Sequence, residues 1–230
     1  MPRVATRSSA MPLACRYISG EVEIAVWEID ESEEVLLSLS GDDARASVSG
    51  YKSAQRRSER LAVRLLLKEL VGSDAVIVYD SCGKPLLADG TAFISVSHTA
   101  GYAAVAVCRC YEVGLDIELV SRAVGSVSRR FMREEELEAH PRPLREKAAL
   151  LRWTASEAIF KLVGDLGGNY RDNIFLEQKV VVQSDVLRAA IVNMPRNDEF
   201  YIKYLFDGAL LLTLCHGRAQ GAGQGIARVV

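Results

Sequence analysis

The sequence lacks any long hydrophobic run. Its longest apolar stretches, such as residues 102–108 and 209–212, are far shorter than the roughly 20 residues that a membrane-spanning helix needs. Residues 1–10 carry Arg3 and Arg7 but no apolar segment of the kind found in a secretory signal. We therefore expect a cytoplasmic protein that has no membrane contact.

Paired cysteines are also missing, because the five cysteines are scattered and include no Cys-x-x-Cys motif. Two of them, at 108 and 110, would share one face of a strand, but no further Cys or His pair lies at zinc-finger spacing. We expect reduced thiols at all five positions, which are Cys15, Cys82, Cys108, Cys110 and Cys215.

The chain has no strong excess of charge of either sign. A net charge of −2 and an isoelectric point near 6.0 give no overall attraction to nucleic acid, so we expect none as a partner. With 49% hydrophobic and 25% charged residues among 230, the chain can bury a core as one large domain or two small ones.

What the sequence does contain is an acidic pair inside an apolar run, Val-Gly-Leu-Asp-Ile-Glu at residues 113–118. If the run is a strand, Asp116 and Glu118 point to the same face and Ile117 to the other. Two carboxylates held so close favour a hard divalent cation, such as Mg²⁺, between them. The alternative is the end of an edge strand whose acids face water.

A second cluster lies in Trp-Thr-Ala-Ser-Glu-Ala-Ile-Phe-Lys at residues 153–161, within an apolar-periodic segment that has no Gly or Pro before Gly164. On a helix, Glu157 and Lys161 are one turn apart on one face. The alternative is an ordinary surface pair that contributes roughly 0.3 kcal/mol.

A third cluster combines Gly-Lys-Pro at 83–85 with Ile-Ser-Val-Ser-His at 94–98. It places a cation, Lys84, a hydroxyl, Ser97, and an imidazole, His98, where strands give way to turns. Taken singly, such residues are more often a solvated lysine and a hydrogen-bonded structural histidine.

Together, in this order, the motifs resemble the 4'-phosphopantetheinyl transferase superfamily, and specifically its larger, monomeric type. The resemblance extends more loosely from the segment near residue 52 to Gly164 and covers about two-thirds of the chain. One departure is Ser156, which stands where members of this type commonly have Lys. Arg152 or another basic residue would have to replace that charge, or turnover would be weaker.

The resemblance implies an α+β fold made of two similar α/β subdomains related by a pseudo-twofold axis, each a small antiparallel sheet packed on a long helix. We place the first, coenzyme A-binding half at residues 13–112 and the second, catalytic half at 113–216. Residues 1–12, where Met11 is an alternative start, are expected to be a disordered arm, and the glycine-rich residues 217–230 a flexible tail.

Periodicity and turn signals predict individual elements. The dipeptide Asp-Gly at residues 207–208 is a strong hairpin signal. Helices are expected at 52–71, 134–139 and 145–163, and strands at 21–29, 76–79, 92–97, 101–109, 113–118, 174–183, 200–206 and 209–215.

The family's chemistry assigns roles to these residues. Asp116, Glu118 and Glu157 are predicted to hold Mg²⁺, or Mn²⁺ in its place. Glu157 would accept a serine proton and Lys161 would neutralise charge on the diphosphate, with Asp116 as the third catalytic group. Neither Asp116 nor Glu157 is expected to support the core. Contacts to coenzyme A are predicted from Lys52, Arg57, Lys84, Ser97, His98 and Lys161, with Arg60 or Arg64 as substitutes for Arg57.

The implied activity is transfer of the 4'-phosphopantetheine arm of coenzyme A, the co-substrate, to a serine of an apo acyl or peptidyl carrier protein, by a monomeric Mg²⁺-dependent enzyme. One alternative is a coenzyme A or carrier-protein binding module with little turnover. Another is a metal-dependent coenzyme A diphosphate hydrolase, because Arg-Glu-Glu-Glu-Leu at 133–137 is similar to the acidic core of a Nudix motif. Gly125, however, stands where that motif has Glu.

Overall fold

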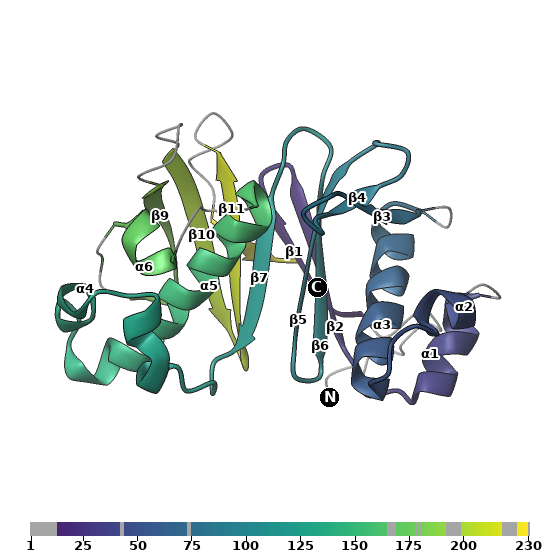
Figure 1. Ribbon diagram of the computed structural model, residues 1–230, viewed down its shortest axis with the longest axis horizontal. Helices are drawn as coiled ribbons and strands as arrows, with labels where there is room; N and C mark the ends of the chain where they lie inside the picture. The colour runs from purple at the N-terminus through teal and green to yellow at the C-terminus, as the bar shows by residue number, and fades with distance from the viewer. Residues whose placement is uncertain are drawn as a thin grey trace, which may run out of the picture.

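The computed structural model of the chain (Figure 1) describes residues 13–41, 44–72, 75–164, 169–177, 179, 181–191, 199–217 and 225–229. Their strands form two five-stranded sheets and a short hairpin, in which every strand pair is antiparallel. This confirms a mixed helix and sheet fold with antiparallel sheets.

The first sheet has the strand order β12-β1-β2-β6-β5, and the second has the order β7-β11-β10-β9-β8. The strands of the first sheet are β1 (Leu13–Ser19), β2 (Val22–Glu28), β5 (Phe93–Thr99), β6 (Tyr102–Cys108) and β12 (Ala227–Arg228). Those of the second are β7 (Gly114–Leu119), β8 (Ile174–Leu176), β9 (Ser184–Ile191), β10 (Glu199–Asp207) and β11 (Leu210–Gly217). The hairpin consists of β3 (Ile77–Tyr79) and β4 (Pro85–Leu87).

One long helix covers the outer face of each sheet, as Figure 1 shows. These helices are α3 (Ala54–Leu70), beside the first sheet, and α5 (Arg145–Val163), beside the second. Shorter helical segments are α1 (Glu33–Ser40), α2 (Ala44–Val48), η1 (Gly125–Arg130), α4 (Glu134–Glu138), η2 (Arg142–Leu144) and α6 (Tyr170–Asn173).

Three hydrophobic cores separate the four layers. One lies between α3 and the first sheet, with Leu61 and Val105 among its members. The second lies between the two sheets, where Ile24 of one approaches Ile117 of the other. The third lies between the second sheet and α5 and includes Ile159. The order of layers is therefore helix, sheet, sheet, helix.

The long helices follow the sequence expectations closely. Ser53 caps α3 by accepting a hydrogen bond from the Arg56 backbone N–H at 3.5 Å, as short polar side chains do at helix starts. Helix α5 occupies residues 145–163, as predicted, and ends at Gly164, whose φ of +82° is a conformation that glycine adopts readily.

Several short elements differ from the sequence expectations. We did not predict β1, α1 or α2, and within the described residues of the strand expected at 174–183 only those of β8 form a strand. The next strand, β9, begins only at Ser184 and was not predicted either. The predicted hairpin is confirmed, because Asp207 pairs with Leu210 and Gly208 has a φ of +58°.

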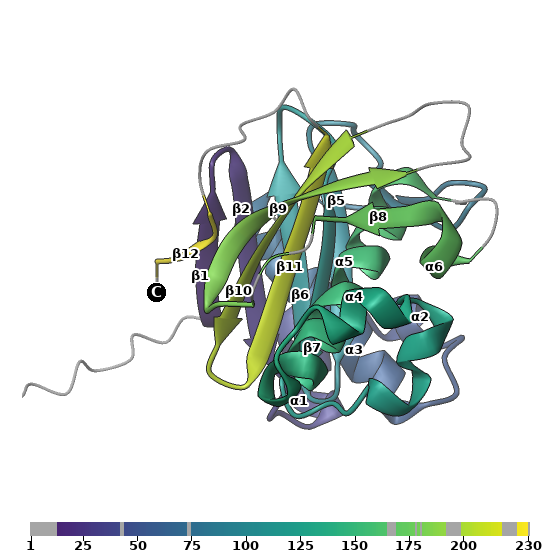
Figure 2. The same cartoon turned by 90° about the vertical axis from the view of Figure 1, so that its left-hand side faces the viewer.

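The C-terminal end corrects another expectation. Residues 227 and 228 form β12 beside Tyr17 and Ile18 of β1 (Figure 2), and Ile226 is buried in the core between the sheets. A flexible tail across all of 217–230 is therefore wrong for these residues. The expected disordered arm at 1–12 and residues 218–224 lie outside the described residues.

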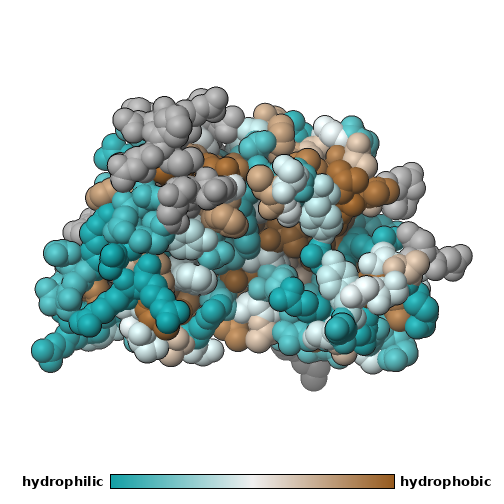
Figure 3. Space-filling model, in the orientation of Figure 1, coloured by the Kyte–Doolittle hydropathy of each residue, from teal (hydrophilic) through white to brown (hydrophobic). Residues whose placement is uncertain are grey.

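Hydrophobic and hydrophilic residues gather over different elements at the surface. In Figure 3, hydrophobic residues gather over β3, β4 and the upper end of β5, whereas hydrophilic residues dominate the side of α4 and the start of α5. Exposed apolar side chains on the hairpin include Val78 and Tyr79. Within the described residues, no helix combines the length and the apolarity required to cross a bilayer.

Candidate active site

The site lies where the inner edges of the two sheets meet. Strands β5 and β7 lie side by side (Figure 1), yet they belong to different sheets. Serine hydroxyls bridge them, because the backbone N–H groups of Leu115 and Ile117 donate to Ser95 Oγ at 2.8 Å and to Ser97 Oγ at 3.1 Å. The side chains of β5 thus supply acceptors that strand carbonyls would otherwise provide.

Asp116 lies on β7 at this seam and is only 7% exposed. Its Oδ1 accepts hydrogen bonds from Lys161 Nζ at 2.7 Å and from Ser97 Oγ at 2.8 Å. Lys161 also donates to the Leu115 carbonyl at 2.9 Å. Burial raises the pKa of Asp116, while Lys161 and Ser97 oppose that rise. Asp116 is therefore a buried, hydrogen-bonded group at the seam, and the expectation that it does not support the core stays a prediction.

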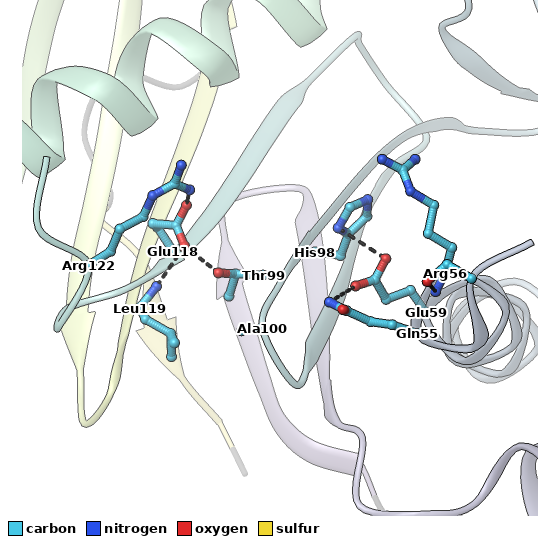
Figure 4. A pocket seen from close by; sticks show the side chains of 10 residues that line it. Gln55, Arg56, Glu59, His98, Thr99, Ala100, Glu118, Leu119 and Arg122 are labelled. Atoms are coloured by element: carbon cyan, nitrogen blue, oxygen red, sulfur yellow. Dashed lines mark hydrogen bonds and ion pairs between the residues drawn. The ribbon is translucent and has the colours of Figure 1, made fainter. Parts of the chain in front are cut away.

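Glu118, two residues further on, is 4% exposed and is held from both sides (Figure 4). One carboxylate oxygen accepts from the Thr99 hydroxyl and from the Leu119 backbone N–H, and the other accepts from the Arg122 guanidinium. Arg122 in turn lies over the ring of Trp153, 5.9 Å from its centroid. The charge of Glu118 is thereby compensated within the chain.

Strand alternation confirms that the two acids share a face. In the pairing of β7 with β11, Asp116 lies opposite Thr213, and Glu118 lies opposite Leu211. The Thr213 hydroxyl forms a hydrogen bond with Thr154 of α5, so both acids are on the face of the sheet that is turned to α5. Ile117 points to the opposite side, into the core between the sheets.

Glu157 and Lys161 approach the same region from α5. Burial and the nearby charge of Asp116 raise the pKa of Glu157, while Lys161 and a hydrogen bond with the Tyr170 hydroxyl oppose that rise. The ring of Tyr170 is packed between Trp153 and Phe160, at centroid distances of 6.2 and 6.3 Å. Glu157 is thus a carboxyl group that binds a proton more readily than an exposed one.

The donor chemistry of the three acids fits a hard divalent cation. All three are carboxylates, which are ligands that hard cations prefer. The charge of Asp116 raises the pKa of Glu157, and the charge of Glu118 raises the pKa of Asp116. A bound cation would therefore relieve the repulsion among the three acids. Among the described residues, however, no three Asp, Glu, His or Cys side chains are already arranged as a ligand set. The chain's own cations, Lys161 and Arg122, hold two of the three acids.

Two pockets open at the seam, one lined by Glu118 and the other by Lys161. One, of about 570 Å³, lies between the start of α3 and the ends of β5 and β7, and Figure 4 shows its lining. The other, of about 420 Å³, is more apolar and lies between β4, β5 and the end of α5. The residues that line the first include Arg56, Glu59, His98, Thr99, Glu118 and Arg122; those of the second include Lys84, Pro85, Ile94, Val96, Phe160 and Lys161.

The first half contributes two of its predicted residues to these pockets. His98 Nδ1 lies 3.4 Å from a Glu59 carboxylate oxygen, and Gln55 donates to the other oxygen at 2.9 Å. Lys84 Nζ donates to the Leu162 carbonyl at 2.8 Å and lies 3.0 Å from Glu112. Lys84 therefore links the hairpin of the first half to the end of α5.

The structure does not bring Arg57 to either pocket. Its guanidinium makes two hydrogen bonds to Glu33 of α1, at 2.7 and 2.8 Å, and others to the carbonyls of Tyr51 and Lys52. Lys52 is exposed just before α3. Arg56, which we did not single out from the sequence, lines the first pocket instead.

Arg152 places its guanidinium directly at Ser156. It is 2% exposed and donates to Ser156 Oγ at 2.6 Å and to the Ile174 carbonyl at 2.8 Å. It also lies 3.6 Å from Glu136. Arg152 is thus a buried group that ties α5 to β8, and its replacement of the lysine charge stays a prediction.

Sequence reasoning missed Thr99, Arg122 and Tyr170. Thr99 continues the alternation of Ser95 and Ser97 along β5, so the pattern Ser-x-Ser-x-Thr was available as a signal. Nothing in the sequence connects Arg122 or Tyr170 with the acids that they contact.

The comparisons with known proteins bear on the second half. Residues 112–209 match the model of the 4'-phosphopantetheinyl transferase superfamily. The matched segment begins just before β7 and includes Asp116, Glu118, Glu157 and Lys161. A search of curated proteins finds no match. The family match identifies residues 112–209 of the chain as a domain of the 4'-phosphopantetheinyl transferase superfamily.

Proposed function

We propose that this chain transfers the 4'-phosphopantetheine arm of coenzyme A to a serine of an apo acyl or peptidyl carrier protein, releasing 3',5'-ADP and holo carrier protein. The observation that carries the proposal is the meeting of Asp116, Glu157 and Lys161 at a seam between two sheets. Pockets walled by both halves open on either side of that seam, as is usual for ligand sites.

Mg²⁺, or Mn²⁺ in its place, would be held by Asp116, Glu118 and Glu157 and would neutralise charge on the diphosphate of coenzyme A. Lys161 would lie beside the same diphosphate, since its ammonium group is already at Asp116. A fixed cation at this place stabilises charge as it develops on the leaving phosphate.

Glu157 is the group that we assign to the serine proton. Its raised pKa, caused first by burial, makes it a better proton acceptor than an exposed carboxylate. The serine oxygen forms a bond to the β-phosphorus, the bond from that phosphorus to the bridging oxygen breaks, and the serine proton moves to Glu157. The nucleophile belongs to the carrier protein, so the chain needs none of its own.

The first half would bind the rest of coenzyme A. His98, Arg56 and Lys84 line the two pockets and carry groups that suit phosphate contacts. Lys52 stays a candidate from the family resemblance. We favour Arg56 over Arg57, because the donors of Arg57 are engaged with Glu33.

Three further proposals concern the whole protein. Because both halves line the first pocket, one chain supplies a complete cleft, which supports a monomer. We also propose that residues 13–112 and 113–216 are the two subdomains and that a pseudo-twofold axis relates them. A cytoplasmic location suits the proposed partner and the free cysteines.

The alternative of a Nudix-like hydrolase gains no support from its acidic segment. Glu136 accepts a hydrogen bond from the Arg133 backbone N–H at 2.7 Å and lies 3.6 Å from Arg152. It is thus a helix-capping and ion-pairing group and not part of the seam.

Mass spectrometry of a mixture containing the protein, coenzyme A, Mg²⁺ and an apo carrier protein tests the proposal. A mass gain of one phosphopantetheine on the carrier is expected. Loss of coenzyme A without that gain would indicate a hydrolase, and unchanged species would indicate a binding module. A panel of acyl and peptidyl carrier proteins in the same assay identifies the partner class.

The acids are tested by Asp116→Asn and Glu157→Gln, which retain the shape of the side chains and remove their charge. Each is expected to lower the transfer rate by about two orders of magnitude or more. Glu134→Gln, at an exposed position of α4, is the matched control and should be as active as the parent. Full activity of either seam variant would contradict the assignment.

A further inference from the structure

Glu118, one of the proposed cation ligands, forms an ion pair with Arg122, a residue to which the proposed function gives no role. The carboxylate is buried and the guanidinium side chain is 49% exposed, so the pair lies at the wall of the first pocket (Figure 4). A buried carboxylate needs compensation of its charge. In this structure Arg122 and Thr99 provide it.

A divalent cation would have to compete with Arg122 for the Glu118 carboxylate. One carboxylate oxygen accepts from Thr99 and Leu119, and the other accepts from Arg122. Both oxygens are therefore engaged. Because Arg122 is the more exposed partner and follows β7 in a turn, it is the group that can leave most readily.

A displaced Arg122 would stay at the pocket. Its side chain lines the same cavity as Arg56 and His98, which come from the opposite wall (Figure 4). Of the acids in that lining, Glu59 already faces His98 and Gln55. Among the described residues that line this pocket, a guanidinium freed from Glu118 would therefore find no unengaged acid. It would suit a phosphate group, which it can bind through two hydrogen bonds.

We propose that Arg122 is an internal counter-ion: a divalent cation displaces it from Glu118, and it then binds a phosphate of the anionic co-substrate. This inference rests on the proposed function, because it takes Glu118 as a cation ligand. It makes cation binding and anion binding cooperative, since the first event supplies a charge for the second.

Calorimetric titration of the full chain with Mn²⁺ alone, and then with coenzyme A at saturating Mn²⁺, tests the exchange. Arg122→Gln removes the competing charge and should tighten Mn²⁺ binding by about fivefold. It should also weaken coenzyme A binding by about tenfold, the loss expected for a charged hydrogen bond. Arg129→Gln, an exposed arginine of η1, should change neither value.

Opposite shifts of the two affinities distinguish exchange from a structural role. If Arg122→Gln weakens both ligands or leaves Mn²⁺ affinity unchanged, the proposal is wrong, and absence of Mn²⁺ binding to the parent chain would overturn it too. The carrier-protein mass assay is independent of these titrations, so a positive assay with a failed exchange would reject this inference alone.

Fluorescence of Trp153 adds a readout that a structural role would not move. The chain has two tryptophans, and Trp27 lies in the core of the first half. In a Trp27→Phe background, Mg²⁺ should produce a saturable change in emission as Arg122 leaves the ring of Trp153. Adding Arg122→Gln should abolish that change. If Trp27→Phe fails to fold, the calorimetric test still decides.

Discussion

Ser97 performs two tasks with one hydroxyl group. It donates to Asp116 at 2.8 Å and accepts from the Ile117 backbone N–H at 3.1 Å. We predicted this residue as a coenzyme A contact, but its hydroxyl is directed to β7. We therefore propose a positioning role, in which Ser97 fixes the orientation of an acid at the seam.

Ser97→Ala tests this role. The substitution leaves a buried carboxylate and a buried backbone N–H each short of one partner, so we expect the free energy of unfolding to fall by about 1–3 kcal/mol. Urea denaturation followed by circular dichroism measures the change. Ser81→Ala, in an exposed turn, is the control and should alter stability little; equal stability of parent and Ser97→Ala would contradict the role.

At the residue scale, periodicity correctly predicted which side chains share a face of a single strand or helix. The alternation of a strand placed Asp116 and Glu118 on one face, and the turn of a helix placed Glu157 beside Lys161. The partners of these acids could not be predicted in this way. Arg57 was misjudged for a related reason, because its partner Glu33 lies on a helix that the sequence did not reveal.

At the scale of elements, β7 and α5 approach so closely that only a glycine fits between them. A Cβ atom built on Gly114 would lie 1.9 Å from the Ala158 carbonyl oxygen, which belongs to a helix backbone and cannot turn aside. Gly114 opens the strand that carries both acids, and Ala158 follows Glu157. The close approach therefore sets the distance between the two sources of acidic side chains.

Gly114→Ala should be destabilising for this reason. Separating β7 from α5 costs contacts on both, so we expect a loss of about 1–3 kcal/mol in unfolding free energy. Gly50→Ala is a matched control, because a Cβ there meets nothing within 4 Å. Thermal melting of the two variants compares them directly. A variant at position 114 as stable as that at 50 would show that the two elements can move apart freely.

The long elements were predictable because their signals are local. Helix α5 runs without Gly or Pro from Arg145 to Val163, and Gly164 ends it. The C-terminal end was not predictable, because its glycine-rich composition indicates a loose segment. Tertiary contacts hold this end in place: Ile226 is 6% exposed, and the Val229 backbone N–H donates to the Arg16 carbonyl at 2.8 Å.

At the scale of the whole molecule, the core between the two sheets contains basic side chains as well as hydrophobic ones. His216 of β11 is fully buried and lies between the rings of Tyr111 and Tyr201, at centroid distances of 5.9 and 5.8 Å. Its Nδ1 lies 3.0 Å from the Gly217 carbonyl, and its Nε2 has no hydrogen-bond partner in the part of the chain that the structure describes. Lys203 is buried on β10 and lies opposite Leu214 in the pairing of β10 with β11. Protonation of either group would therefore place a positive charge in the core between the two sheets.

Burial lowers the pKa of His216 below its usual value of 6.5, and the charge of Lys203 acts in the same direction. Between the lowered pKa and 6.5 the unfolded chain binds more protons than the folded chain. The free energy of unfolding must then fall as the pH falls through 6.5, and it stops falling from this cause below the native pKa. His140, whose pKa is also lowered by burial, contributes with the same sign.

His216→Phe should reduce this acid sensitivity. The phenyl ring keeps the contacts with Tyr111 and Tyr201 but cannot be protonated, so it removes up to one proton from the difference between the folded and unfolded states, or about 1.4 kcal/mol per pH unit. Urea denaturation at several values between pH 7.5 and about 5, above the range where carboxylates dominate, gives the slope for each protein. Because His140 is retained, some slope should persist in the variant. Identical slopes for the two proteins would mean that protonation of His216 does not oppose the packing of one sheet on the other.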